Sequence, residues 1–150
     1  MVRDEVLRVH PWNFAVKRES LAAETDTVTW GSVTLNAFLL PNDNLRLLEL
    51  LDSERFEWQL EQNKILSTES VLYIRYIFRS KDPNNYDSQF INAVSTRMAI
   101  ELCEPLTQSN TKKRMLLAEL ADNIRRAQRA DGFENPPATF VEDDWINARY

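Results

Sequence analysis

The first part of the chain is rich in charged residues, with apolar residues set among them at helical spacing. In residues 2–23, Val6, Leu7 and Leu21 recur between acidic and basic side chains, and Pro11 interrupts the run. Apolar positions three or four residues apart share one face of a helix, and proline kinks or restarts it. The pattern predicts a helical segment with a kink near Pro11.

Alternation of apolar and polar residues replaces helical spacing after residue 25. Four segments show it: 33–40, 45–51, 56–61 and 71–79. Successive side chains of a strand point to opposite faces, so this alternation predicts strands. Segment 45–51 holds five leucines, and a short helix is the competing interpretation there.

Segment 71–79 is expected to pair centrally in a small antiparallel sheet. Leu72, Ile74, Tyr76 and Phe78 occupy its alternate positions and would share one face. We predict that apolar helix surfaces cover this face.

Two longer helices are predicted after a polar turn. Asp87 or Ser88 is the expected N-cap of the first, because short polar side chains accept hydrogen bonds from free backbone amides. The first helix should run to about Glu104, and residues 105–110, which begin with proline, should break it. The second should end near Gly132, antiparallel to the first.

The expected fold class is α+β: a helical bundle of three main helices with an inserted small antiparallel β-sheet and an extended C-terminal arm. Residues 1–132 would form the domain, and residues 133–150 the arm. The arm shows neither helical nor strand periodicity, and Pro136-Pro137 stiffens its start. Its apolar residues are too few to form a core, so we expect them to need a partner.

Composition narrows the classes of function. The 18 Lys and Arg against 23 Asp and Glu give a net charge of −5, which disfavours broad binding to phosphate backbones. Two glycines cannot build a glycine-rich phosphate cradle, and a single cysteine excludes an internal disulfide and a multi-cysteine zinc site. The apolar runs are too short to span a membrane, and the charged N-terminus does not resemble a secretory signal.

The residues that could do chemistry are isolated from one another. His10 and Cys103, each the only one of its kind, lack a partner nearby in the sequence that would activate a nucleophile or complete a metal site. Carboxylates cluster at Glu101/Glu104, Glu57/Glu61 and residues 142–144, but no pattern makes them converge. We therefore predict a protein that is not an enzyme, with no catalytic, cofactor-binding or metal-binding residues and no cofactor.

The most distinctive runs are Pro11-Trp12-Asn13-Phe14-Ala15 and Leu102-Cys103-Glu104-Pro105-Leu106-Thr107. Between them, Leu40-Pro41-Asn42-Asp43, Tyr73-Ile74 and Asp82-Pro83 follow in a characteristic order and spacing. Together these stretches, spread over residues 4–131, resemble the podophage tail tubular protein A family. Neither distinctive run is a catalytic motif.

The resemblance implies a structural head-to-tail adaptor of a short-tailed phage. Its partners would be copies of itself in a ring of twelve, the portal protein and a tail nozzle similar to tail tubular protein B. Double-stranded DNA would pass through the lumen without specific binding, and no membrane is involved. The protein would be found in the virion, at the head–tail junction, after assembly in the host cytoplasm.

Two other functions remain as alternatives. One is a glycan-degrading hydrolase within the tail, which a cleft with converging carboxylates would favour. The other is a nucleic-acid-binding module, which salt-dependent retention of DNA would favour.

Two groups of residues are candidate contacts in the ring. The basic residues of the last helix are expected to form inter-subunit ion pairs: Lys112, Lys113, Arg125, Arg126 and Arg129. The arm is expected to bind the portal or a neighbouring protomer through Phe140, Trp145, Ile146, Arg149 and Tyr150. A solvated helix face and an arm folded back on its own domain are the competing interpretations.

Removal of residues 133–150, or Trp145→Ala, should weaken attachment to portal-bearing heads without unfolding the domain. An anchoring tryptophan contributes on the order of 2–4 kcal/mol to binding. Co-sedimentation with heads and thermal unfolding measure the two effects. Undiminished attachment, or loss of folding, would contradict the arm's role.

Overall fold

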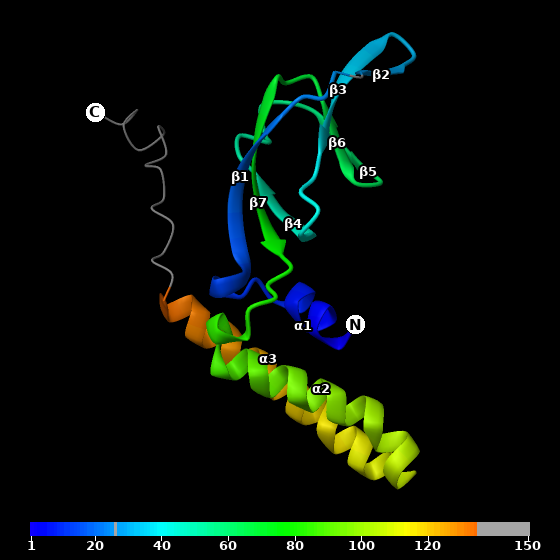
Figure 1. The fold of residues 1–150 in the computed structure, drawn as a ribbon, viewed down its shortest axis with the longest axis vertical. Coiled ribbons are helices and arrows are strands. Elements are labelled where there is room, and N and C mark those ends of the chain that lie inside the picture. Colours follow the sequence, from blue (N-terminus) through cyan, green and yellow to red (C-terminus); the bar gives the residue numbers. More distant parts are fainter. Residues whose placement is uncertain (26, 135–150) are drawn as a thin grey trace, which may run out of the picture.

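The computed structural model describes residues 1–25 and 27–134. Within these ranges the chain forms three α-helices, seven strands and two short 3₁₀ turns (Figure 1). The helices are α1 (Val2–Val9), α2 (Ser88–Thr107) and α3 (Asn110–Glu134). The strands are β1 (Val16–Ala22), β2 (Thr27–Trp30), β3 (Val33–Leu39), β4 (Asn44–Leu50), β5 (Trp58–Glu61), β6 (Lys64–Ser67) and β7 (Val71–Phe78). The 3₁₀ turns cover Asn13–Ala15 and Pro83–Asn85.

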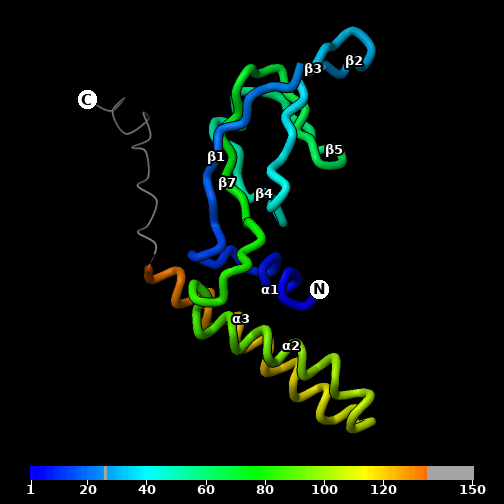
Figure 2. Tube along the Cα trace, viewed as in Figure 1, coloured from blue at the N-terminus to red at the C-terminus, as the bar shows by residue number. Residues whose placement is uncertain are grey.

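The strands form two antiparallel sheets, one with the order β1-β7-β4 and the other with the order β2-β3-β6-β5. The molecule is elongated (Figure 2): the β2–β3 hairpin lies at one end, and the antiparallel pair α2 and α3 projects from the other. Helix α1 lies where the strands meet the helical pair (Figure 1).

This architecture corrects the expected fold class. A bundle of three main helices with an inserted small sheet is wrong, because strands dominate the first two thirds of the chain. The strand predictions for residues 33–40, 45–51 and 71–79 are confirmed by β3, β4 and β7, and β5 confirms part of 56–61. Strands β1, β2 and β6 were not expected.

The helix predicted over residues 2–23 ends at Val9. His10 precedes Pro11 and is extended, with φ −135° and ψ 139°, because the proline ring disfavours helical geometry in the residue before it. The chain then forms β1, which pairs with β7 from Val16↔Ile77 to Ala22↔Val71. This pairing joins residues 49 to 61 positions apart in the sequence, so periodicity within residues 16–22 does not reveal it.

Strand β7 separates two hydrophobic cores. On one face, Leu72, Ile74 and Tyr76 join Phe38 and Ile65 in a core between the two sheets. On the other face, Ile77 joins a core with residues of α1, α2 and α3 and with Trp12. The prediction that Leu72, Ile74, Tyr76 and Phe78 face helices is therefore corrected: the second sheet covers them, and on the opposite face Ile77 meets the helices while Val71 and Tyr73 are exposed.

The ends of the helical pair follow the expected signals in part. Asp87 caps α2, its side chain accepting a hydrogen bond from the Gln89 amide at 3.0 Å, as predicted. Pro105 does not break α2 at the expected place, because it lies in the last turn, where helix geometry persists to Thr107. The helix ends at Gln108, whose φ of 50° is left-handed. Helix α3 continues past Gly132 to Glu134.

The end of α3 is attached to the segment that follows α1. A hydrogen bond joins His10 Nε2 to Asp131 Oδ2, with both residues buried. Nearby, Asn13 Nδ2 donates to Glu134 Oε2 at 2.8 Å. On α2, the Arg97 guanidinium contacts Glu5 at 3.1 Å. These contacts fix the helical pair to the rest of the molecule at one end.

Trp12→Ala should lower the free energy of unfolding by about 3–5 kcal/mol, the usual cost of truncating a large buried aromatic side chain. Trp12 is fully buried, packs on Phe90 with ring centroids 5.2 Å apart, and donates its indole N–H to the Val6 carbonyl. Urea denaturation measures the change.

The matched control for this prediction is Trp30→Ala. The Trp30 side chain is 83% exposed, so its removal should change the free energy of unfolding by no more than about 0.5 kcal/mol. Equal effects of the two substitutions would contradict the proposed core.

Candidate functional site

Tyr76 organises a polar cluster at the edge of the core between the sheets. Its hydroxyl lies 2.9 Å from Glu19 Oε2 and 3.1 Å from Asp43 Oδ1. Lys17 Nζ donates to the other oxygen of Asp43 at 3.0 Å and lies 4.7 Å from the centre of the Phe78 ring. One hydroxyl proton is thus shared between two carboxylates, beside a single ammonium group.

The cluster shifts the pKa values of two of its members. Burial, together with the hydrogen bonds to Glu19 and Asp43, raises the pKa of Tyr76 far above its ordinary value. Burial alone would raise the pKa of Asp43, but hydrogen bonds from Lys17 and Tyr76 and the Lys17 charge lower it overall. At neutral pH the tyrosine is protonated and Asp43 is ionised, which suits a structural cluster better than proton transfer.

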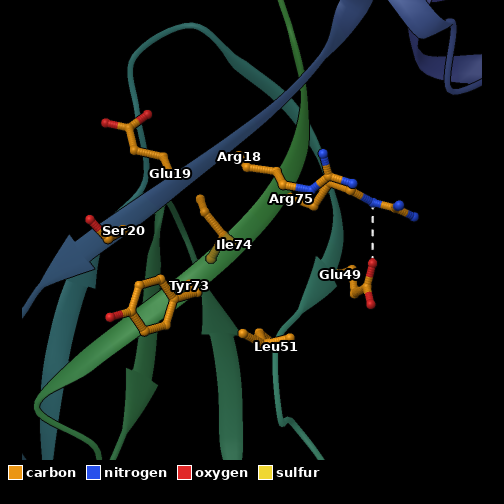
Figure 3. A pocket seen from close by; sticks show the side chains of 8 residues that line it. All are labelled: Arg18, Glu19, Ser20, Glu49, Leu51, Tyr73, Ile74 and Arg75. Atoms are coloured by element: carbon orange, nitrogen blue, oxygen red, sulfur yellow. Dashed lines mark ion pairs between the residues drawn. The ribbon is translucent and has the colours of Figure 1, made fainter. Parts of the chain in front are cut away.

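A cavity of about 560 Å³ opens on the outer face of the β1-β7-β4 sheet (Figure 3). Arg75 forms an ion pair with Glu49 at 3.2 Å there, and Arg18 lies beside it on β1 without an ion pair in the described part of the chain. Ser20 and Tyr73 add hydroxyl groups to the lining. Neither His10 nor Cys103 lines it, so a nucleophile activated by histidine is not assembled in this cavity.

His10 and Cys103 both have structural surroundings. The His10 ring meets Trp12 edge to face, with centroids 5.0 Å apart, and is held by Asp131. The Cys103 thiol is buried and lies 3.3 Å from Thr107 Oγ1. They lie on different elements, at the connection after α1 and in α2.

The carboxylate groups singled out by sequence have different surroundings. Glu101 pairs with Arg97, and Glu104 pairs with Lys113 at 2.8 Å, so both serve helix contacts. Glu57 and Glu61 instead line an open cavity of about 500 Å³ on the β2-β3-β6-β5 sheet. Residues 142–144 lie outside the described residues.

We call the surface around this second cavity the Trp30 face. It is lined by Val28, Trp30, Val33, Leu35, Glu57, Trp58, Gln59, Glu61 and Leu66. Trp30 and Trp58 are both exposed, although aromatic side chains usually supply much of the core of a small domain. The sequence signal for the exposure of Trp30 is the two-residue turn that follows it. Gly31 in this turn has a φ of 64°, and the turn leaves the tryptophan at the tip of a hairpin.

The five basic residues predicted to form inter-subunit ion pairs all lie on α3. Lys113 pairs with Glu104 within the chain, and Arg125 lies 3.5 Å from Asp122 on an exposed surface. Lys112, Arg126 and Arg129 are exposed and have no ion pair among residues 1–25 and 27–134. The arm residues Phe140, Trp145, Ile146, Arg149 and Tyr150 lie outside the described residues.

An apolar groove of about 440 Å³ runs between α2 and α3 near the turn that joins them. Its lining includes Leu102, Cys103, Leu106, Met115 and Leu116. Leu106 is 75% exposed and Met115 67% exposed, although both are large apolar residues. Contiguous apolar surface of this kind usually marks an interaction site.

The described residues contain no group of three or more His, Cys, Asp or Glu side chains placed to hold a metal ion. Over the same part of the chain, none of the helices has the length and apolar character needed to cross a membrane.

Comparison with known proteins leaves the family open. No protein-family model matches the sequence, and no curated protein matches it. The functional argument therefore rests on the residues and their geometry.

Asp43→Asn should lower stability at pH 6 and have a progressively smaller effect as the pH falls below about 4. The pKa of Asp43 is lowered in the folded state, so its stabilisation is present above the unfolded pKa and is lost as pH falls through the folded value. Thermal unfolding of both proteins between pH 7 and pH 2.5 tests this.

Asp52→Asn is the control for this experiment, because the Asp52 side chain is 56% exposed and lies 4.0 Å from Arg55. It should change stability little at any pH. If the effect of Asp43→Asn were independent of pH, the Lys17–Asp43–Tyr76 cluster would not stabilise the fold as described.

Proposed function

We propose that this chain is a structural subunit of a head-to-tail adaptor ring in a short-tailed phage. The ring lies between the portal and the tail nozzle, and DNA passes through its lumen. The resemblance of residues 4–131 to the tail tubular protein A family supports this proposal. So does the surface of the subunit, which leaves apolar areas uncovered at both of its ends.

The observation that carries the proposal is the uncovered far half of the helical pair. The core next to the helices includes Val94 on α2 and Leu120 on α3 but no residue closer to the turn that joins them. Beyond these residues the two helices pack on each other and expose Leu106 and Met115. Water-exposed leucine and methionine are costly at about 25 cal/mol per Å² of apolar surface, so a protein partner would stabilise this region.

A ring needs two different contact surfaces on each subunit. Identical surfaces that pair with each other give closed dimers, whereas head-to-tail contacts between unlike surfaces give rings. The apolar groove between α2 and α3 and the Trp30 face lie toward opposite ends of the molecule (Figure 1) and differ in composition. This asymmetry favours a ring over a symmetric dimer.

The attachment arm would begin at a fixed position. Asp131 and Glu134, at the end of α3, bond to His10 and Asn13. The C-terminal segment therefore starts from a defined point beside the β1-β7-β4 sheet (Figure 1). A truncation that tests the arm is best placed after Glu134, because removal from Phe133 also deletes the Glu134–Asn13 contact.

One observation favours the hydrolase alternative: Glu57 and Glu61 line a cavity together with Trp30 and Trp58. Aromatic rings and carboxylates are the groups that bind and cleave sugars. However, four residues of extended chain separate the two glutamates by about 13 Å. Glycoside hydrolysis needs carboxyl groups about 5–9.5 Å apart, so the geometry favours a binding surface over a catalytic pair.

Electron microscopy of the purified protein, alone and mixed with portal-bearing heads, should show closed rings with a central channel. The double substitution Leu106→Glu and Met115→Glu should abolish the rings and leave a species of subunit mass, because buried charges oppose the helix contacts. Circular dichroism should remain unchanged, since both side chains are exposed in the subunit.

The matched control is Leu51→Glu with Val71→Glu, two exposed apolar residues away from the helices. Rings should persist in this variant. A wild-type protein that stays monomeric both alone and with heads would contradict the adaptor function.

A further inference from the structure

The Trp30 face combines an exposed apolar surface with unpaired negative charge. Trp30 is 83% exposed, and Val28 and Val33 beside it are 40% and 49% exposed. Glu57 and Glu61 are exposed and have no ion pair within the described ranges. The one lysine of strand β6, Lys64, pairs with Glu24, so it does not offset them.

Helix α3 carries a surface of the opposite character. At 100° per residue, Arg114, Arg125 and Arg129 fall on one side of the helix, which the burial pattern shows to be exposed. Ala118 and Ala121 lie between them on the same side and are also exposed. We call this side the arginine face. Small residues let a helix approach another surface closely, and flanking arginines offer charge.

We propose that the arginine face of α3 in one subunit docks on the Trp30 face of the next subunit in the ring. This inference rests on the proposed adaptor function, because it names the contact that joins successive copies. Trp30 packs over Ala118 and Ala121. Arg125 and Arg129 form ion pairs with Glu57 and Glu61 at the other side of the sheet.

The dimensions of the two surfaces agree. Strands β2 and β5 are three strand spacings apart, about 14 Å, and the register places Glu57 two residues and Glu61 six residues along β5 from the level of Trp30. Trp30 therefore lies about 16 Å from Glu57 and about 24 Å from Glu61. With Trp30 over Ala118, Arg125 and Arg129 lie about 10 and 16 Å along the helix, and extended arginine and glutamate side chains span the remaining distance of about 6–8 Å to Glu57 and Glu61.

Charge also selects among the three candidate partners of the Trp30 face: the C-terminal segment, DNA and the arginine face of a second copy. The C-terminal segment of the chain contains Glu142, Asp143 and Asp144, and DNA is polyanionic, so Glu57 and Glu61 repel both. The arginine face has the complementary charge. Arg125 has only an exposed partner, Asp122, and Arg114 and Arg129 have no ion pair in the part of the chain that the structure describes.

The contact is head-to-tail, because the Trp30 face and the arginine face belong to different parts of the subunit (Figure 2). Each subunit would offer its Trp30 face to one neighbour and its arginine face to the other, and repetition closes a ring. The apolar groove between α2 and α3 is lined by another side of α3, through Met115, Leu116 and Glu119, so it is left for a separate contact.

Charge reversal tests the proposal on the full-length chain. One variant carries Glu57→Arg with Glu61→Arg, and a second carries Arg125→Glu with Arg129→Glu. Each alone should lose ring assembly by sedimentation velocity and electron microscopy, because like charges then face each other across the contact. An equimolar mixture should form rings of alternating variants, since the altered faces of the two variants have opposite charge and so do their unaltered faces. One chain with all four changes should also assemble.

Controls separate this contact from general effects of charge and folding. Arg8→Glu with Lys81→Glu changes the net charge as much as the α3 variant does, at exposed positions on other elements, and should assemble normally. Trp30→Ala should weaken assembly at least tenfold in subunit concentration while circular dichroism stays unchanged. The neutral pair Glu57→Gln and Glu61→Gln gives a milder test of the same charges.

Assembly of either reversed variant alone, or failure of the folded mixture and the fourfold variant to assemble, would overturn the proposed contact. If wild-type rings form but the reversals do not affect them, the contact is wrong and the adaptor function stands. If the wild-type chain forms no ring with portal-bearing heads, both proposals fail.

Discussion

The position of strand β7, with one face buried and both edges paired, is the constraint on which the rest of the molecule depends. Leu72, Ile74 and Tyr76 face the second sheet, while Ile77 faces the helices. The strand also bonds to β1 on one side and β4 on the other. A shift of one residue would turn Leu72, Ile74 and Tyr76 to the face on which Val71 and Tyr73 are exposed, so the register of β7 is fixed and with it the positions of β1 and β4.

This arrangement explains why the polar cluster lies where it does. Tyr76 must remain buried as part of β7, yet its hydroxyl needs partners, and a buried hydroxyl without them costs about 1–3 kcal/mol. Glu19 on β1 and Asp43 before β4 supply acceptors from the two neighbouring segments. The same cluster therefore satisfies the tyrosine and ties both partner strands to β7.

Sequence reasoning succeeded where local patterns determine structure. Alternation identified β3, β4 and β7, and Asp87 marked the start of α2. It failed where the structure depends on pairing between strands that are far apart in the sequence. Strand β1 has a mixed pattern that resembles a helix and becomes a strand because β7 offers a partner. The Trp30 face was missed for the same reason, since strands β2, β3, β6 and β5 must pair before its residues meet, although Glu57 and Glu61 were noticed as a pair.

The helical pair α2 and α3 is attached to the rest of the molecule at one end and projects from it at the other. Its contacts with the rest of the chain lie around His10, Glu5 and Asp131, whereas the turn at residues 108–109 lies at the far end. Helix α2, with 20 residues, is about 30 Å long. The attachment reaches Arg97, so about ten residues of α2, or about 15 Å, project beyond it, and a tilt of about 5° moves the tip by about 1.3 Å. Small rotations at the buried histidine and aspartate are thus amplified at the tip, which gives the pair a mechanical compliance that the two sheets lack.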